Sequence, residues 1–245
     1  DYISEASQKT LFCYSVKANS NLSLLKLIAS QGMGFDVVSK GELHRAIKAG
    51  ANPKRIVYSG VGKTKEEIAY ALNNKILCFN VESEEELLAI NSQASLMKLK
   101  ADISIRINPD VKVKTHPYIS TGMRENKFGI AYEDAFEIYK KAKQLDSINI
   151  VGIDFHIGSQ IMSIEPYLDS ISSVKKLIQK LDTIDIKLSH IDVGGGLGIS
   201  YKGEKLVDKS EYVKTIINSL SDLDLNIIFE PGRSIVGDCG ILVSQ

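Results

Sequence analysis

The sequence predicts an α/β fold, a TIM-type (β/α)8 barrel, on three observations. The chain has 245 residues, which is the usual size of one such barrel. Eight short apolar runs alternate with seven amphipathic segments, and alternating strands and helices form parallel sheets covered by helices. Eight strands favour closure into a barrel, and an open doubly wound sheet is the architectural alternative.

Apolar, β-prone runs mark the expected strands, and amphipathic segments mark the expected helices. We expect strands at residues 11–16, 35–39, 56–59, 76–81, 103–107, 150–156, 188–193 and 227–230. We expect helices at residues 22–31, 41–49, 65–73, 84–93, 132–145, 164–181 and 210–223. Ser83 with Glu86 predicts a capping box, and Gly50 predicts a helix end. Residues before Asp1 could supply the eighth cover helix.

Composition excludes several classes of protein. The 30 Lys and Arg residues balance the 30 Asp and Glu residues, so no basic excess is present to neutralise a nucleic-acid backbone. The longest apolar runs fall far below the roughly 20 residues of a membrane span. Cys13, Cys78 and Cys239 form no C-x-x-C pair, which indicates buried strand thiols rather than disulfides or zinc. We therefore expect a cytoplasmic protein with no nucleic-acid partner, no membrane contact and no metal.

Three further features concern the limits and connections of the fold. Asp1 is not an initiator methionine, and residues 235–243 have the apolar pattern of a strand without a partner. We therefore expect a barrel truncated at both ends and belonging to a longer chain. Residues 109–129 form a long connection after the fifth expected strand, on the barrel face where active sites are built.

Two glycine-rich segments resemble phosphate-binding motifs. Residues 60–64 end in the Gly-Lys-Thr of a P-loop, but Val57 occupies the position of the leading glycine, so a nucleotide site is disfavoured. Residues 194–199 resemble a dinucleotide fingerprint, but Ile199 stands at its last glycine position and no helix follows at once. Gly194 to Gly196 still offer backbone N–H groups to an anion such as phosphate, with a plain tight turn as the alternative.

Polar residues gather at the carboxyl ends of the expected strands, which meet at one mouth in a barrel. They are Lys17, Asp36, Ser39, Arg106, His156, Ser159, Gly194 to Gly196 and Glu230. A lysine amine can form a Schiff base with an aldehyde, a glycine loop can hold phosphate, and a carboxylate can pair with a protonated pyridine nitrogen. Together these functions predict pyridoxal 5′-phosphate as the cofactor. The turn at 230–233 adds a cation for phosphate or a substrate carboxylate.

Segments over nearly the whole chain match motifs of one enzyme family in order. They are Tyr-Ser-Val-Lys-Ala-Asn-Ser-Asn at 14–21, Gly-Phe-Asp-Val-Val-Ser-Lys-Gly-Glu-Leu at 34–43, Tyr-Ser-Gly-Val-Gly-Lys-Thr at 58–64, Arg-Ile-Asn-Pro at 106–109, Thr-His-Pro-Tyr-Ile-Ser-Thr-Gly at 115–122, Lys-Phe-Gly-Ile at 127–130, Phe-His-Ile-Gly-Ser-Gln-Ile at 155–161, Asp-Val-Gly-Gly-Gly-Leu-Gly at 192–198 and Glu-Pro-Gly-Arg at 230–233. The sequence resembles the diaminopimelate decarboxylases, barrel-type pyridoxal-phosphate enzymes related to ornithine and arginine decarboxylases and, more distantly, to alanine racemase.

The resemblance implies a role for each site residue. Lys17 is expected to bind the cofactor covalently, His156 to pack on the cofactor ring, and Glu230 to pair with the ring nitrogen, which makes these three the catalytic residues. Arg233 is also expected to bind a substrate carboxylate. The implied cofactor-binding residues are Lys17, Asp36, Arg106, His156, Ser159, Gly194, Gly195, Gly196, Glu230, Pro231, Gly232 and Arg233. From desolvation, we expect a lowered pKa for the Lys17 amine.

The implied reaction is decarboxylation of meso-2,6-diaminoheptanedioate to L-lysine and carbon dioxide, the last step of lysine biosynthesis. The alternatives are an ornithine, arginine or carboxynorspermidine decarboxylase of the same fold, or a non-catalytic pyridoxal-phosphate-binding barrel. The resemblance divides the chain into a cofactor-binding barrel at 1–234 and, at 235–245, the start of an absent C-terminal β domain. That domain and a partner subunit of a homodimer are expected to complete the site, so we expect the isolated fragment to be inactive.

Overall fold

A closed barrel of eight parallel strands forms the centre of the computed structural model, which describes residues 9–109, 128–241 and 243. The barrel strands are β1 (Thr10–Ser15), β2 (Gly34–Val37), β3 (Ile56–Tyr58), β4 (Cys78–Val81), β5 (Ala101–Asn108), β7 (Ile148–Asp154), β8 (His190–Asp192) and β9 (Asn226–Phe229). Every one of them overlaps a predicted strand. A two-residue strand, β6 (Ile130–Ala131), pairs with β5 outside the ring and was not predicted.

Strand pairing closes the ring. Neighbours along the chain pair in parallel, β4 pairs with β5, and the last strand, β9, pairs with β1. The rings of Phe12 and Phe229 stack across this last junction with centroids 5.1 Å apart. Closure confirms the (β/α)8 barrel and excludes the doubly wound sheet.

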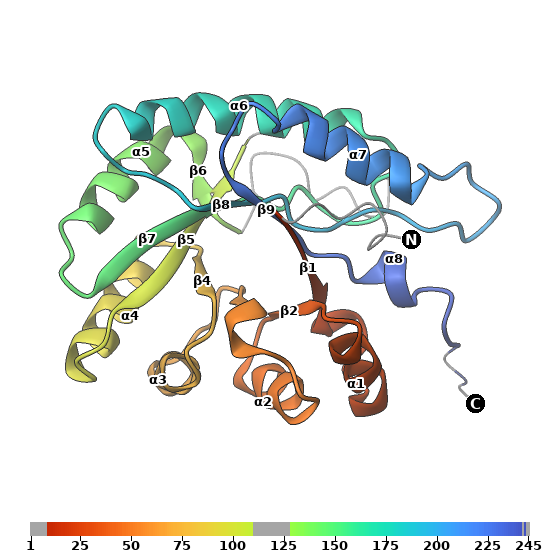
Figure 1. The fold of residues 1–245 in the computed structure, drawn as a ribbon, viewed down its shortest axis with the longest axis horizontal. Coiled ribbons are helices and arrows are strands. Elements are labelled where there is room, and N and C mark those ends of the chain that lie inside the picture. The colour runs from red at the N-terminus through yellow and green to blue at the C-terminus, as the bar shows by residue number, and fades with distance from the viewer. Residues whose placement is uncertain (1–8, 110–127, 242, 244–245) are drawn as a thin grey trace.

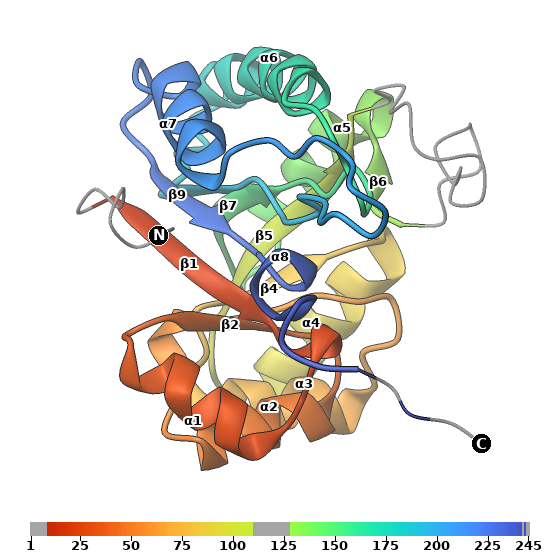
Figure 2. The ribbon, with the colours of Figure 1, turned by 90° about the vertical axis from the view of Figure 1, so that its right-hand side faces the viewer.

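Helices cover the outside of the barrel (Figures 1 and 2). They are α1 (Leu22–Ser30), α2 (Lys40–Lys48), α3 (Lys65–Asn74), α4 (Glu84–Leu96), α5 (Tyr132–Lys143), α6 (Glu165–Asp182) and α7 (Lys209–Ser219). The short helix α8 (Arg233–Val236) and the 3-10 turn η2 (Val16–Ala18) lie instead at the carboxyl ends of the strands, and a second 3-10 turn, η3 (Pro53–Arg55), precedes β3. The first seven match the predicted helices. Ser83 caps α4 through the Glu86 N–H, whereas the full capping box belongs to Thr64 and Glu67 on α3. No helix in the described part of the chain has the length and apolarity needed to cross a membrane.

The inside of the barrel is apolar at one end and polar at the other. Cys13, Val57, Cys78 and Ile228 pack together in a small cluster apart from the main core. Because side chains alternate along a strand, residues two positions further on face the same interior. Those residues are Ser15, Ser59, Asn80 and Glu230, all polar and buried. The alternation of side chains along the strands thus places these polar groups inside the mouth of the barrel.

The structure corrects the prediction for residues 235–243. Ile235 and Val236 lie in α8, and the described residues from 237 to 241 form no strand. Cys239 is exposed rather than buried in a strand, while Cys13 and Cys78 are buried as predicted. Of the long connection predicted at 109–129, residues 110–127 lie outside the described residues.

Candidate functional site

The carboxyl ends of the strands surround a cavity of about 770 Å³. Lys17 lies in η2 directly after β1, His156 and Ser159 follow β7, and Glu230 follows β9. The cavity wall includes Lys17, His156, Ser159, Gly196, Glu230, Gly232 and Arg233. Ser39, placed in the second strand by the sequence prediction, instead caps α2 by accepting from the Glu42 N–H. Most predicted site residues therefore meet at one opening.

Lys17 and Asp36 form an ion pair at the mouth. The Lys17 amine donates to Asp36 Oδ2 at 2.6 Å, and Ser15 Oγ donates to the same oxygen at 2.9 Å. Burial alone would lower the pKa of the Lys17 amine, but Asp36 and Glu230 raise it above its ordinary value. The lowered pKa predicted from desolvation is therefore wrong, because that prediction did not include the charge of Asp36 beside the amine. Asp36, in turn, has its pKa lowered by Lys17 against the opposing effect of burial.

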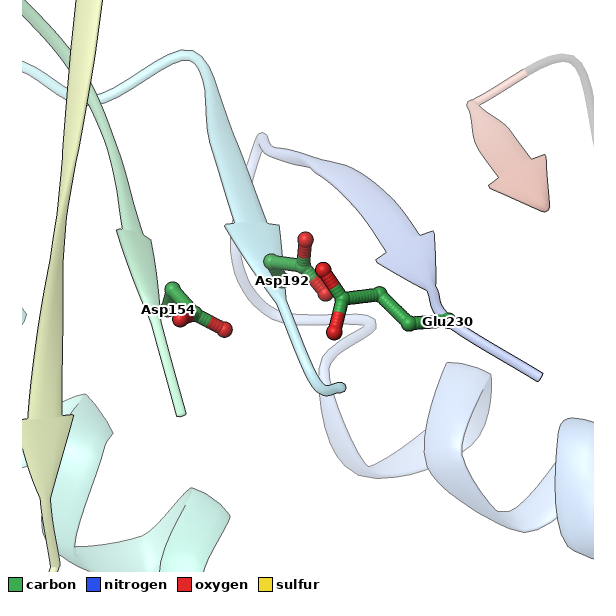
Figure 3. A group of neighbouring side chains, drawn as sticks. All are labelled: Asp154, Asp192 and Glu230. Atoms are coloured by element: carbon green, nitrogen blue, oxygen red, sulfur yellow. The ribbon is translucent and has the colours of Figure 1, made fainter. Parts of the chain in front are cut away.

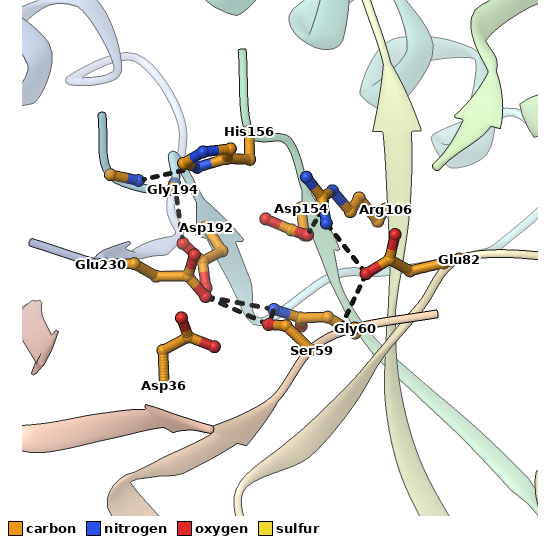
Figure 4. Close-up of polar contacts among 12 residues, drawn as sticks. Asp36, Ser59, Gly60, Glu82, Arg106, Asp154, His156, Asp192, Gly194 and Glu230 are labelled. Atoms are coloured by element: carbon orange, nitrogen blue, oxygen red, sulfur yellow. Dashed lines mark hydrogen bonds and ion pairs between the residues drawn. The ribbon is translucent and has the colours of Figure 1, made fainter. Parts of the chain in front are cut away.

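Arg106 contacts two carboxylates below the cavity (Figure 4). Its guanidinium donates to Glu82 Oε1 at 2.9 Å, and its Nε lies 3.8 Å from Asp154 Oδ2. Glu82 Oε1 also accepts from the Gly60 N–H at 2.8 Å. Arg106 is thus a counter-ion for buried acids, and it is not among the residues of the cavity wall.

His156 is held as a neutral imidazole. Its Nδ1 accepts from the Gly195 N–H at 3.3 Å, so the ring proton is assigned to Nε2. Burial, together with the nearby charges of Arg106 and Lys17, lowers the pKa of His156 to about 3. An uncharged ring at this place is suited to packing against a flat aromatic ligand.

The glycine turn after β8 lies against other backbone segments. A Cβ on Gly195 would stand 2.1 Å from the Glu230 carbonyl oxygen, and one on Gly196 would stand 2.3 Å from the Gly158 carbonyl oxygen. Gly194 and Gly196 also have φ values of +66° and +99°, which favour glycine. Side chains are excluded here, so the bare backbone lines this side of the site.

Arg233 and Ser159 meet at one edge of the cavity. The guanidinium donates to Ser159 Oγ at 3.2 Å and to the hydroxyl of Tyr201, whose ring lies 5.9 Å from the guanidinium carbon. The Glu204 carboxylate accepts from the backbone N–H of Tyr201 and so holds this loop. A cation and a hydroxyl at the end of a glycine-lined cavity can bind phosphate or carboxylate.

Glu230 lies among polar groups that the sequence reasoning did not single out. Asn80 and Ser59 donate to Glu230 Oε1 at 3.4 and 3.5 Å. Within the described residues, Asp154, Asp192 and Glu230 each place a carboxylate oxygen within 4.8 Å of the others (Figure 3). An acidic residue inside an otherwise apolar, buried strand, as at 154 and 192, is the signal that could have identified them.

The Gly-Lys-Thr segment is structural. The Lys63 amine donates to the carbonyl oxygens of Gly60 and Asn80 and to Glu86 Oε1, and its side chain is 1% exposed. Thr64 caps α3. With its amine bound inside the protein, Lys63 is not available to a nucleotide.

Residues 2–237 match the family model described as pyridoxal-dependent decarboxylase, pyridoxal binding domain. The chain belongs to this family. Among curated proteins, this chain is 50% identical to the diaminopimelate decarboxylase of Vibrio cholerae over 236 residues, which is 96% of this chain and 57% of that protein. It is 46% identical to the diaminopimelate decarboxylase of Pseudomonas aeruginosa, over 98% of this chain and 58% of that protein. The chain therefore spans less than two thirds of the length of these relatives.

Solved structures share the fold of the decarboxylase domain. Diaminopimelate decarboxylase from Helicobacter pylori, crystallised with L-lysine, has a TM-score of 0.91 and 48% identity, covering 96% of this chain and 60% of its own. The arginine decarboxylase of Paramecium bursaria Chlorella virus has a TM-score of 0.78 and 28% identity, covering 92% of this chain and 58% of its own.

The residues at the mouth fit pyridoxal phosphate, the cofactor of the pyridoxal-dependent decarboxylase family. The donor set has three parts in the right chemical classes: an amine on Lys17, a cation and hydroxyl on Arg233 and Ser159, and a buried carboxyl on Glu230. The glycine turn packs tightly against other backbone segments, and its Gly196 lies in the cavity wall with Ser159 and Arg233, where a phosphate can be held. The cavity and its chemistry thus match an aldehyde, a phosphate and a ring nitrogen on one ligand.

Proposed function

We propose that the full-length protein decarboxylates meso-2,6-diaminoheptanedioate to L-lysine and carbon dioxide, as the last step of lysine biosynthesis. The observation that carries this proposal is the 46 to 50% identity to curated diaminopimelate decarboxylases over 96 to 98% of the chain. The L-lysine bound to the H. pylori relative is the product expected from this substrate.

Pyridoxal phosphate, when bound, supplies an electron-withdrawing ring that accepts the electron pair left behind as carbon dioxide departs. Lys17 holds the cofactor aldehyde, and Asp36 orients the Lys17 amine through their 2.6 Å contact. Ser159, Gly196, Gly232 and Arg233, which lie in the cavity wall, would hold the phosphate, and Gly194, Gly195 and Pro231 would support them from behind. Glu230 would pair with the ring nitrogen of the cofactor and favour its cationic form, in which the ring withdraws electrons more strongly.

His156 and Arg233 have supporting roles. The neutral imidazole of His156, whose pKa is lowered by burial, would pack on one face of the cofactor ring and exclude water from it. Arg233 anchors a carboxylate of the substrate, and its contact with Tyr201 fixes the direction of the guanidinium. Arg106 acts from below the cavity by neutralising Glu82 and Asp154.

The proposal extends to the assembly of the enzyme. We infer a cytoplasmic homodimer in which a C-terminal β domain, beginning near residue 235, and the partner subunit complete the active site. Residues 1–245 alone would then bind cofactor weakly and turn over no substrate. Decarboxylation by residues 1–245 at the full-length rate would contradict this part of the proposal.

The test is an assay of carbon dioxide release by the full-length protein. Meso-diaminoheptanedioate, ornithine, arginine and carboxynorspermidine are supplied separately, and release only from the first is expected. Release from ornithine, arginine or carboxynorspermidine would instead indicate one of the other decarboxylases of this fold, such as the 28% identical arginine decarboxylase. Cofactor binding with no release from any amino acid would favour a non-catalytic carrier.

A further inference from the structure

We propose that Asp192 is a positioning residue for Glu230, and that the two carboxyl groups share a single proton. This inference rests on the proposed function in one respect, namely that Glu230 faces the cofactor ring nitrogen. Asp192 would then set both the direction of the Glu230 carboxyl group and the negative charge that it presents to the ring.

The geometry places the two carboxyl groups face to face. Asp192 ends β8, Glu230 directly follows β9, and these two strands pair in parallel, with Asp192 opposite Ile228. Figure 3 shows the two side chains pointing at each other from adjacent strands. One oxygen of Asp192, Oδ1, accepts from the Gly194 N–H at 2.9 Å, which anchors the side chain to the glycine turn.

The other oxygen of Asp192 has no donor. Oδ2 is fully buried and lacks a hydrogen-bond partner among the described residues. Its side-chain neighbours are the Asn80 amide and the Glu230 carboxyl group, which itself accepts from Asn80 and Ser59. Two ionised carboxylates are both acceptors and repel one another, so a contact between them is favourable only when one carries a proton.

The balance of buried charge points the same way. Two cations, Lys17 and Arg106, form ion pairs with buried carboxylates inside the mouth. Their partners are already assigned, because Lys17 pairs with Asp36 and Arg106 contacts Glu82 and Asp154. No cation in the described part of the chain forms an ion pair with Asp192 or Glu230. Two unpaired carboxylates at this depth would be strongly destabilising, whereas one proton between them halves the charge.

The titration behaviour agrees with the geometry. Burial and the charge of Asp36 raise the pKa of Asp192 to about 7 despite its bond from the Gly194 N–H, and burial with the charge of Asp192 raises the pKa of Glu230 above its ordinary value. Both carboxyl groups thus retain a proton at a pH where an ordinary carboxyl group is ionised, as a shared proton requires. The other titratable or charged groups around the pair are Asp36 on β2, Cys13 on β1, Cys78 on β4, Arg106 on β5, Asp154 on β7 and Lys17 in η2.

Two variants separate the proton-sharing role from a structural one. Asp192→Asn keeps an acceptor for the Gly194 N–H and places an NH₂ donor toward Glu230, but it has no carboxyl proton. Asp192→Ala removes the anchor and the donor together. A matched control is Asp102→Asn, which changes a carboxyl group on β5 that accepts from the Asn149 side chain. If Asp192 only anchored the turn, Asp192→Asn would behave as wild type in every readout.

The experiment is an infrared pH titration of the full-length protein, with a parallel absorbance titration of the bound cofactor. We expect the C=O stretch of a buried protonated carboxyl group at pH 6, shifted by ¹³C labelling of aspartate or glutamate carboxyl groups. We expect the spectral step near pH 7 to be lost in Asp192→Asn and retained in Asp102→Asn, whereas a band from Asp154, whose pKa is also raised by burial, remains in both variants. Asp192→Asn should keep cofactor affinity that Asp192→Ala loses.

Several results would overturn the proposal. A wild-type spectrum without a protonated carboxyl band at pH 6 would do so without any variant, as would a spectral step near pH 7 that persists in Asp192→Asn. A divalent cation held by the three carboxylates would also remove the band and so refute proton sharing. Failure of the wild-type protein to bind pyridoxal phosphate would instead refute the proposed function, because the infrared band is measured whether or not cofactor binds.

Discussion

Substitution of Gly195 by alanine tests whether the glycine turn and Glu230 are packed as one unit. The new Cβ would stand 2.1 Å from the Glu230 carbonyl oxygen, whereas ordinary contact begins at 3.4 Å, so the two backbone segments must separate by about 1.3 Å. Both sides of this contact are backbone, and neither can rotate away. The Glu230 N–H donates to the Gly194 carbonyl at 2.8 Å, and a shift of that size breaks this bond.

The expected effect is larger on function than on stability. Overpacking of this kind costs about 1–3 kcal/mol, which a barrel of this size tolerates. A displacement of about 1 Å at Glu230 lowers kcat/KM by roughly 100-fold, because the carboxyl group no longer meets the ring nitrogen at hydrogen-bond distance.

The assay compares Gly195→Ala with Gly62→Ala in the full-length protein. Gly62 lies in the loop after β3, and a Cβ there meets no atom within 4 Å, so Gly62→Ala should match wild type. Decarboxylation rate, cofactor affinity and thermal unfolding are measured for both variants. A Gly195→Ala enzyme with wild-type kcat/KM and cofactor affinity would show that the turn does not hold Glu230 in place, and the reasoning would be wrong.

Three further predictions follow from individual contacts. Lys17→Ala should abolish the cofactor adduct that borohydride fixes on the wild-type peptide containing residue 17, as read by mass spectrometry; an adduct of equal yield would contradict the assignment. Lys63→Met should destabilise the protein by about 3 kcal/mol in urea unfolding, because it leaves the buried Glu86 without its cation, and ATP should cause no thermal shift in either protein. Burial lowers the pKa of His190 to about 4, so its unfolded state takes up a proton as pH falls below about 6.5 while the folded state does not. The free energy of unfolding should therefore be unaffected by His190 well above pH 6.5 and should fall by about 2 kcal/mol between there and pH 5. Denaturant titrations at several pH values should show that His190→Gln removes this part of the acid sensitivity.

Strand and helix positions were largely predictable because the apolar periodicity of a parallel barrel is strong. All eight barrel strands and the seven longer helices overlap their predicted ranges. The prediction of a strand at residues 235–243 was wrong, because an apolar pattern alone does not distinguish a strand from a short helix. Ile235 and Val236 belong to α8, which begins directly after Gly232. The two-residue strand β6 was too short to leave a periodic signal.

The mouth residues were predictable as a set, but their partners were not. Lys17, His156 and Glu230 stand at strand ends, where sequence position alone brings them to one face. The contacts of Asp154 and Asp192 depend on which strands become neighbours and on the direction of each side chain. The local sequence predicts neither of these two properties. The raised pKa of Lys17 is one result, since it depends on a carboxylate from a different strand.

Closure of the barrel by β9 on β1 has a consequence for the order of events during synthesis. Ser15 and Glu230, which share a hydrogen bond beside the cavity, are separated by 215 residues of sequence. At about 5–20 residues per second, a ribosome needs on the order of 10 to 40 s to pass from one to the other. Throughout that interval the nascent chain carries Lys17 without Glu230 and Arg233, which complete the cavity wall. Cofactor capture therefore reports the final docking step of folding, and its rate offers a direct kinetic probe of barrel closure.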